Sequence, residues 1–170
     1  MSVSRSTRSE TSRDEFGLSW LENGERMSQR EFHERYEKMP PGVKAELIGG
    51  VVYIMASPLK APHGRNDFLL AGWLFDYSVA TPGTTGQLNT TAILDDQSEP
   101  QPDAALLILP THGGQTVDGD DEYTHGAPEL VVEVAWSSRS IDLSDKLRDY
   151  ERAGVLEYLV RDLRGERLFW

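Results

Sequence analysis

The sequence contains no cysteine, and this absence excludes several kinds of site. No disulfide can form, no thiolate can act as a nucleophile, and no zinc or iron–sulfur site can be built on cysteine ligands. A metal ion would have to be held by oxygen and imidazole ligands. Carboxylate-rich sites of that kind favour hard divalent cations such as Mg²⁺.

Long apolar runs are also missing. The run Leu130–Ala135 is among the longest, yet it is far shorter than a bilayer span and contains Glu133. The polar start Met1-Ser2-Val3-Ser4-Arg5 lacks the apolar stretch of a signal peptide. We therefore expect a cytoplasmic protein that does not enter a membrane.

Basic charge is scarce. Lysine and arginine number 17 against 28 aspartates and glutamates, which gives a formal net charge of −11. This balance argues against non-specific binding of nucleic acid through the overall charge of the protein. The charge balance does not exclude local binding of nucleic acid. Carboxylates that bind Mg²⁺ contribute negative charge until the cation is bound, and basic residues elsewhere on the surface can still contact phosphates.

The composition is that of a folded domain. The chain has 170 residues and a mass of 19.1 kDa, with 38% hydrophobic and 26% charged residues, which suits one hydrophobic core and leaves little for a second. Residues 1–17 mix serine, threonine, arginine and acidic residues without apolar periodicity, so they are predicted to form a disordered tail. A single domain is expected over residues 18–170.

Three helices are expected. The first begins at the capping box Ser28–Glu31 and ends before Pro40. The second is a buried helix of about four turns, because apolar residues recur at spacings of three and four. Its predicted buried residues are Phe68, Leu69, Trp73 and Tyr77, with Leu70 and Leu74 beside them. The third has Asp142 as its N-cap and runs to Ala153.

Strands are expected between these helices. The β-prone segments are 46–55 with a hairpin turn at Gly49-Gly50, 84–94, 103–109, 130–135, 156–160 and 166–170, whereas 111–127 is expected to be a long loop. The combination of helices, hairpins and a crossover connection indicates a mixed α/β fold class (α+β).

Two acidic residues occupy apolar strands and are therefore candidates for chemistry. Asp103 opens a strand that is otherwise apolar, and Glu133 interrupts a run of valines. A buried carboxylate needs a partner or a metal ion, and the two converge if their strands are neighbours. An alternative reading remains open, in which Asp103 caps a strand and Glu133 pairs with an arginine.

Lys146 supports the chemical interpretation. On a helical wheel of about 100° per residue, it falls inside the inward arc of the third helix. That predicted arc contains Leu143, Leu147, Tyr150 and Ala153, and the predicted outer residues are Asp145, Arg148, Asp149, Glu151 and Arg152. A lysine on the buried side could reach the two carboxylates and act on a water beside a metal ion, whereas a snorkelling lysine would keep its ammonium in solvent.

These residues belong to a longer ordered series. It comprises Glu46-Leu47-Ile48 with Gly50, Ser57-Pro58, His63-Gly64, Gln101-Pro102-Asp103, Glu133-Val134-Ala135, Asp142, Lys146, Tyr150, Ala153-Gly154-Val155 and Glu157-Tyr158. In order and spacing the series resembles the Uma2 (DUF820) family, restriction-endonuclease-like proteins of the PD-(D/E)xK nuclease superfamily. The resemblance spans roughly Ser28 to the C-terminus.

The resemblance implies a fold and a cofactor. The expected fold is a restriction-endonuclease-like central mixed sheet flanked by helices. Asp103 and Glu133 would be ligands of Mg²⁺, or of Mn²⁺, with Glu46 as a further acidic ligand. Ala135 stands where the superfamily usually keeps its lysine, so Lys146 is the expected replacement on the following helix.

The resemblance also implies further site residues and partners. His63 and Asp142 are additional candidates for the site. The expected partner is DNA, and assembly into a homodimer is compatible with the resemblance.

The nuclease interpretation has two rivals. A non-catalytic module with the nuclease fold could bind a divalent ion or a partner protein, and the net acidity favours it. A hydrolase that uses two carboxylates on a glycosidic bond fits less well, because the buried-side lysine favours phosphate chemistry.

Overall fold

The computed structural model describes residues 20–55 and 60–170. The tail expected at residues 1–17 lies outside the described residues, as do Ser57 and Pro58 of the ordered series. Among the described helices, none is both long enough and apolar enough to cross a membrane.

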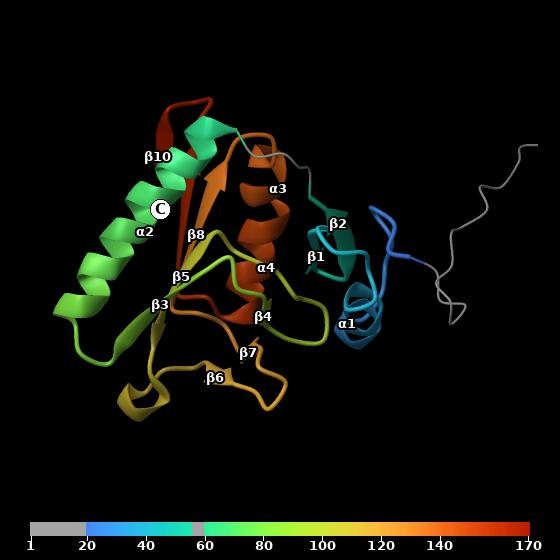
Figure 1. The fold of residues 1–170 in the computed structure, drawn as a ribbon, viewed down its shortest axis with the longest axis horizontal. Coiled ribbons are helices and arrows are strands. Elements are labelled where there is room, and N and C mark those ends of the chain that lie inside the picture. Colours follow the sequence, from blue (N-terminus) through green and yellow to red (C-terminus); the bar gives the residue numbers. More distant parts are fainter. Residues whose placement is uncertain (1–19, 56–59) are drawn as a thin grey trace, which may run out of the picture.

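A five-stranded mixed sheet forms the centre of the structure (Figure 1). Its strands, in spatial order, are β10 (Arg167–Phe169), β9 (Glu157–Asp162), β8 (Leu130–Ala135), β5 (Ala104–Ile108) and β3 (Thr84–Leu88). The β8–β9 pair is parallel and the other pairs are antiparallel. The expected mixed α/β class with a central mixed sheet is therefore confirmed.

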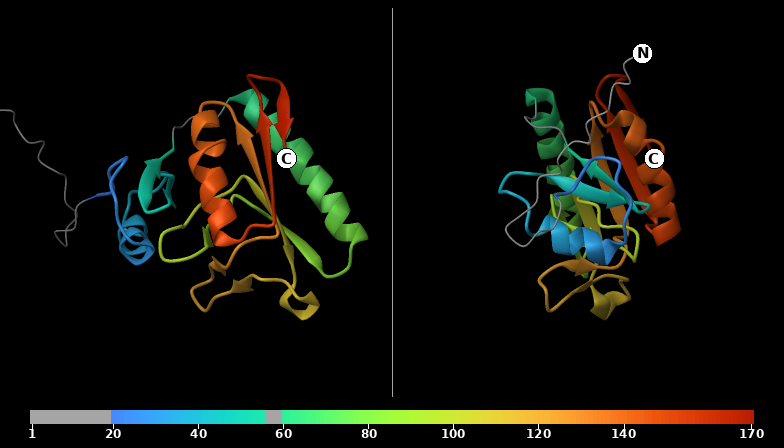
Figure 2. Two further views of the ribbon diagram at one scale, coloured as in Figure 1. Left: turned by 180° about the vertical axis from the view of Figure 1, so that it is seen from behind. Right: turned by 90° about the vertical axis from the view of Figure 1, so that its right-hand side faces the viewer.

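Helices cover both faces of this sheet. Helix α2 (Ala61–Ala80) lies on one face, and α3 (Arg139–Asp142) and α4 (Asp145–Ala153) lie on the other (Figures 1 and 2). Every residue of β8 is buried, as expected for a strand covered on both sides. The core on the α2 side consists of Leu74, Ala104, Leu106, Leu130, Val132 and Leu159.

A hairpin and a short helix lie beyond α4. The hairpin consists of β1 (Ala45–Ile48) and β2 (Val51–Ile54), and the helix is α1 (Gln29–Tyr36) (Figure 1). Gly49 and Gly50 have φ angles of +55° and +74°, which confirms the predicted two-residue turn. The Ser28 hydroxyl caps α1 by accepting from the Glu31 N–H, as predicted.

The region around residues 84–127 differs from the sequence prediction. The strand expected at 84–94 is divided into β3 and β4 (Ala92–Ile93), because Asn89 between them has a φ of +50°. The expected loop at 111–127 contains a 3-10 turn, η1 (Pro110–His112), and two short strands, β6 (Val117–Asp118) and β7 (Thr124–His125). A strand of two residues is too short to show an alternation of apolar and polar residues. The small sheet of β4, β7 and β6 could therefore not be predicted from the sequence.

The predicted buried side of α2 is wrong. Leu74 is the residue of α2 that is fully buried, with Leu70 packed beside it, whereas Phe68 and Leu69 are 77% and 66% exposed. The helix is also longer than predicted, at 20 residues. Apolar residues occupy nearly every side of this helix, so their spacing could not indicate which side meets the sheet.

The prediction for α4 is wrong in part. Asp142 is not its N-cap but the last residue of α3, and Ser144 occupies the N-cap position of α4. Leu147 is 44% exposed although it was predicted to point inward. Asp149 is buried although it was predicted to point outward, because its carboxylate accepts hydrogen bonds from Ser98 and Arg152.

Candidate active site

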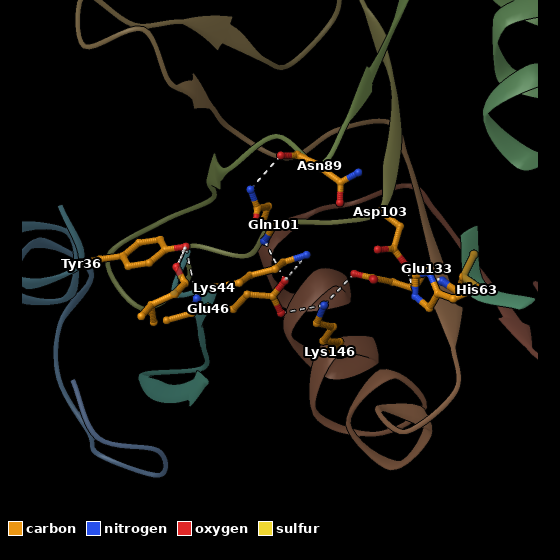
Figure 3. A network of polar contacts seen from close by, with 12 residues as sticks. Tyr36, Lys44, Glu46, His63, Asn89, Gln101, Asp103, Glu133 and Lys146 are labelled. Carbon is orange, nitrogen blue, oxygen red and sulfur yellow. Dashed lines mark hydrogen bonds and ion pairs between the residues drawn. The ribbon is translucent and has the colours of Figure 1, made fainter. Parts of the chain in front are cut away.

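Five segments of the chain meet at a cavity of about 230 Å³ (Figure 3). All six residues singled out from the sequence line this cavity: Glu46, His63, Asp103, Glu133, Asp142 and Lys146. They come from β1, α2, the start of β5, β8 and the α3–α4 segment. The cavity is thus the place where the mixed sheet, the hairpin and helices from both faces converge.

Lys146 lies between two carboxylates (Figure 3). Its Nζ is 2.8 Å from Glu46 Oε2 and 2.8 Å from Glu133 Oε1. Its side chain is only 1% exposed, so the snorkelling alternative does not apply. Burial acts to lower the pKa of Lys146, but the Glu133 and Glu46 carboxylates outweigh it and the pKa lies above its usual value. The ammonium therefore stays charged at neutral pH.

Glu133 projects from the fully buried strand β8. Its Oε1 accepts hydrogen bonds from Lys146 Nζ at 2.8 Å and from the Tyr150 hydroxyl at 3.0 Å. Burial raises the pKa of Glu133 to about 8; Lys146 opposes this shift, and Asp103 and Glu46 add to it. Glu133 thus pairs with the predicted lysine and not with an arginine.

Asp103 stands directly before β5. Because Ala104 pairs with Val132 in the antiparallel register, the next position brings Asp103 opposite Glu133. The Val134 N–H donates to Asp103 Oδ2 at 2.7 Å and fixes the carboxylate at this edge. Burial raises the pKa of Asp103, and the Val134 hydrogen bond opposes that shift.

Glu46 belongs to the same buried network and is not a solvated strand end. Its side chain is fully buried on β1. The Gln101 N–H donates to Oε1 at 3.2 Å, and Lys44 Nζ lies 4.0 Å from the same oxygen. The hairpin thus adds a third carboxylate that shares Lys146 with Glu133.

Asp142 supplies a fourth carboxylate. It is 1% exposed, and neither of its oxygens makes a hydrogen bond of normal geometry to a described residue, although the Ser138 side chain is close enough to lower its pKa. Burial raises the pKa of Asp142, and the charge of Lys146 opposes that shift. A buried carboxylate that is poorly hydrogen-bonded is costly unless a cation compensates it.

His63 enters the cavity from the first turn of α2 and is held by a residue that the sequence analysis did not identify. His63 Nδ1 donates to Asp67 Oδ2 at 2.8 Å, and its Nε2 lies 3.7 Å from Asp103 Oδ2. The hydrogen bond that His63 donates to Asp67 raises the pKa of His63, and burial opposes this shift. The i, i+4 spacing of a histidine and an acid on one helix is the signal that could have revealed Asp67.

Positive charge gathers beside the cavity at Trp136, which lines it. Lys60 Nζ and the Arg164 guanidinium carbon lie 5.5 Å and 5.6 Å from the Trp136 ring centroid. Lys44 lines the cavity as well. This grouping could not be predicted from the sequence, because the residues are far apart along the chain.

Among the described residues, His63, Asp67 and Asp103 form a compact candidate metal site, because one ligand atom from each lies within 4.8 Å of the other two. Glu46, Asp103, Glu133 and Asp142 bring four carboxylates to one cavity, while Lys146 is the fully buried ammonium among them. The two oxygens of Asp142, which make no hydrogen bond of normal geometry to a described residue, have unused acceptor capacity. Carboxylate oxygens are the ligands that Mg²⁺ and Mn²⁺ take in proteins.

Comparison with protein families identifies the chain. The sequence profile of Uma2, described as a putative restriction endonuclease, matches residues 30–170. The chain belongs to the Uma2 family. The match begins at the second residue of α1 and covers all the residues lining the cavity that are named above.

A solved structure has the same fold. It is the crystal structure of a putative nuclease belonging to DUF820 from Anabaena variabilis ATCC 29413, with a TM-score of 0.60 and 12% sequence identity. The superposition covers 76% of this chain and 72% of that one. A search of curated protein sequences found no match.

Proposed function

We propose that this Uma2 protein is a metal-dependent nuclease that hydrolyses phosphodiester bonds in DNA. The observation that carries the proposal is the convergence of Asp103, Glu133, Glu46 and Lys146 on one cavity. Membership of a family described as putative restriction endonucleases supports it. The resemblance of the fold to the DUF820 crystal structure supports the architecture on which the proposal depends.

Asp103 and Glu133 would hold the metal ion, with Glu46 as a further acidic ligand. The Val134 hydrogen bond orients the Asp103 carboxylate, and Tyr150 orients the Glu133 carboxylate. A bound divalent ion supplies Lewis-acid stabilisation of the phosphate charge and lowers the pKa of a bound water.

Lys146 acts as a fixed cation. Because its pKa is raised, the ammonium keeps its proton and orients a water or a phosphate oxygen instead of acting as a general base. It also holds Glu46 and Glu133 on either side of the cavity at 2.8 Å. Its positive charge offsets part of the repulsion between these carboxylates.

His63 would extend the ligand set. Metal-binding histidines usually donate their second ring N–H to a carboxylate, and His63 donates Nδ1–H to Asp67 while Nε2 faces Asp103. Imidazole is a better ligand for Mn²⁺ than for Mg²⁺. We therefore expect the site to bind Mn²⁺ more tightly than Mg²⁺.

The cations beside Trp136 offer contacts for DNA in a protein with a net charge of −11. Lys60 and Arg164 lie against the Trp136 ring next to the cavity. Phosphate contacts of this kind supply sequence-independent affinity that falls as the salt concentration rises.

Nicking of supercoiled plasmid tests the proposal. Purified protein is incubated with plasmid in Mg²⁺, in Mn²⁺ and with a chelator, and conversion to open-circle DNA is measured. We expect nicking that requires either cation and stops with the chelator. If metal stabilises the protein but no plasmid, linear duplex or single-stranded DNA is cleaved, the nuclease proposal is wrong and the non-catalytic metal-binding module is favoured.

A further inference from the structure

The outer side of α2 is an apolar surface that no described element covers. In Figure 1 the helix forms one edge of the molecule, and the views of Figure 2 show the same arrangement. On this side Phe68, Phe75 and Val79 are 77%, 66% and 69% exposed, while Leu74 on the opposite side is 3% exposed. At about 100° per residue, the three exposed side chains fall in a narrow arc around Gly72.

The apolar surface is large enough for a protein interface. Leu69 adds to the apolar surface beside Phe68. At the edge of this surface, Trp73 packs edge-on against Trp170, with the ring centroids 6.0 Å apart. The six exposed side chains of this surface are Phe68, Leu69, Trp73, Phe75, Val79 and Trp170.

An area estimate points to a specific interface. If a fully exposed aromatic side chain contributes about 150–250 Å², the six residues together expose roughly 700 Å². The largest apolar patch of a typical monomer is about 300–600 Å². A stable interface buries about 800 Å² on each partner, so the exposed area matches one side of such an interface.

Charge on the same surface indicates what the partner is. Arg65 and Asp76 are both exposed, and the wheel places them side by side on the outer arc, about three turns apart. Neither has an ion-pair partner in the part of the chain that the structure describes. They are equidistant from the midpoint between Leu70 and Ala71. A second α2 that runs antiparallel across this midpoint would place each arginine opposite the other chain's aspartate.

The backbone near the midpoint is accessible. A Cβ atom added to Gly72 would meet no atom within 4 Å. In the same antiparallel arrangement Gly72 faces Leu69 of the other copy, so a large side chain meets an open position on each side. A two-fold interface requires this reciprocity, because residue i contacts residue j and residue j contacts residue i.

We propose that two copies of this chain associate through the outer side of α2 in an antiparallel, two-fold arrangement. Phe68 and Leu69 lie nearest the two-fold midpoint, Phe75 and Val79 extend the apolar contact towards the helix end, and Arg65 of each copy pairs with Asp76 of the other. This interface is independent of the nuclease proposal, since it involves none of the residues that line the cavity.

Sedimentation equilibrium of the full chain tests the association. We expect the wild-type protein to have twice the 19.1 kDa chain mass at micromolar concentration. Arg65→Asp and Asp76→Arg each replace two opposite-charge pairs by two like-charge pairs and should each raise the dimer Kd about tenfold or more. Glu151→Arg, an exposed charge reversal on α4, is the matched control and should leave the Kd unchanged.

Mixing the two reversed variants tests the antiparallel pairing itself. An equal mixture of Arg65→Asp and Asp76→Arg chains restores opposite charges at both positions, so it should dimerise as tightly as the wild type. The double variant Arg65→Asp/Asp76→Arg should do so alone. A wild-type protein that stays monomeric at 100 µM (roughly 10⁵-fold above a nanomolar Kd), single variants that dimerise normally, or a mixture that stays monomeric would each overturn the proposal. Circular dichroism shows that every variant is folded.

Discussion

Lys146 balances the charge of two buried carboxylates, and its removal should expose that role. At pH 8.5, above the pKa of Glu133, Lys146→Ala leaves Glu46 and Glu133 buried without their shared cation, which should lower the free energy of unfolding of the metal-free protein by about 3–5 kcal/mol. Metal should restore much of this loss, and cleavage should fall sharply while metal binding persists. Urea unfolding with chelator and with Mn²⁺ measures the effect.

Lys44→Ala is the matched control for that experiment. Lys44 Nζ lies 4.0 Å from Glu46 and its side chain is a third exposed, so its loss should cost less than about 1 kcal/mol. If both lysine variants have the same stability with chelator, Lys146 is not the cation on which the buried carboxylates depend.

The raised pKa of Glu133 predicts how metal stabilisation varies with pH. Its pKa is about 8 in the folded protein against an ordinary 4.5, so the folded state holds a proton that the unfolded chain has already lost. The resulting stabilisation is complete below pH 4.5 and is lost as the pH rises through 8. The metal-free protein should therefore lose stability over this range.

Bound metal should reduce the loss of stability at higher pH, because a carboxylate that ligates a cation needs no proton. The increase in Tm caused by Mg²⁺, measured against chelator by differential scanning fluorimetry, should grow steadily between pH 6 and pH 8.5. An increase in Tm that is flat or that shrinks over this range contradicts the assignment of Glu133 as a ligand.

Asp67 should control metal affinity through His63. Asp67→Ala removes the acceptor of the His63 Nδ1–H and frees the ring to change tautomer, which should weaken Mn²⁺ binding about 10–100-fold. Calorimetric titration with Mn²⁺ measures this, and Asp76→Ala on the exposed side of the same helix should bind Mn²⁺ like the wild type. Equal affinities for the two variants would remove His63 from the proposed ligand set.

At the level of elements, α2 offers a direct comparison of its two sides. Leu74→Ala opens a cavity in the core between α2 and the sheet and should cost about 2–5 kcal/mol of unfolding free energy. Leu69→Ala on the same helix removes a side chain that is 66% exposed and should cost about 0.5 kcal/mol or less. Chemical denaturation at low protein concentration, where association does not contribute, measures both. A larger cost for Leu69→Ala would mean that the buried side of α2 is assigned wrongly.

The elements that could be predicted from the sequence are those with a local cause. The capping hydroxyl of Ser28, the Gly49-Gly50 turn and the uninterrupted apolar strand 130–135 each act within a few residues, and each was predicted. The buried side of α2 depends instead on which of several apolar sides meets β3, β5 and β8. The break at Asn89 depends on pairing with β7, more than 30 residues away.

More of the candidate site than of the surrounding fold could be predicted from the sequence. Carboxylates in apolar strands and a lysine on the inner arc of a helix conflict with their local surroundings, and such conflicts can be read directly from the sequence. Asp67 and the cluster at Trp136 create no local conflict, so only the three-dimensional arrangement reveals them.

For the molecule as a whole, the net charge of −11 is consistent with the proposed activity because positive side chains gather at the cavity where DNA would bind. Four of the 28 acidic residues line the cavity, where a divalent ion would offset them, while Lys44, Lys60 and Arg164 lie at or beside the same cavity. DNA would therefore meet local positive charge on an acidic protein.

The initial rate of plasmid nicking in Mn²⁺ by Asp103→Asn protein tests whether the cavity is the active site of a metal-dependent nuclease. Asp121→Asn is the control, because Asp121 is exposed, pairs with His125 and lies outside the cavity. We expect a rate about 100-fold or more below wild type for Asp103→Asn and an unchanged rate for Asp121→Asn, with both variants folded. Asp103→Asn protein that nicks plasmid at the wild-type rate would contradict the assignment of the cavity as the active site.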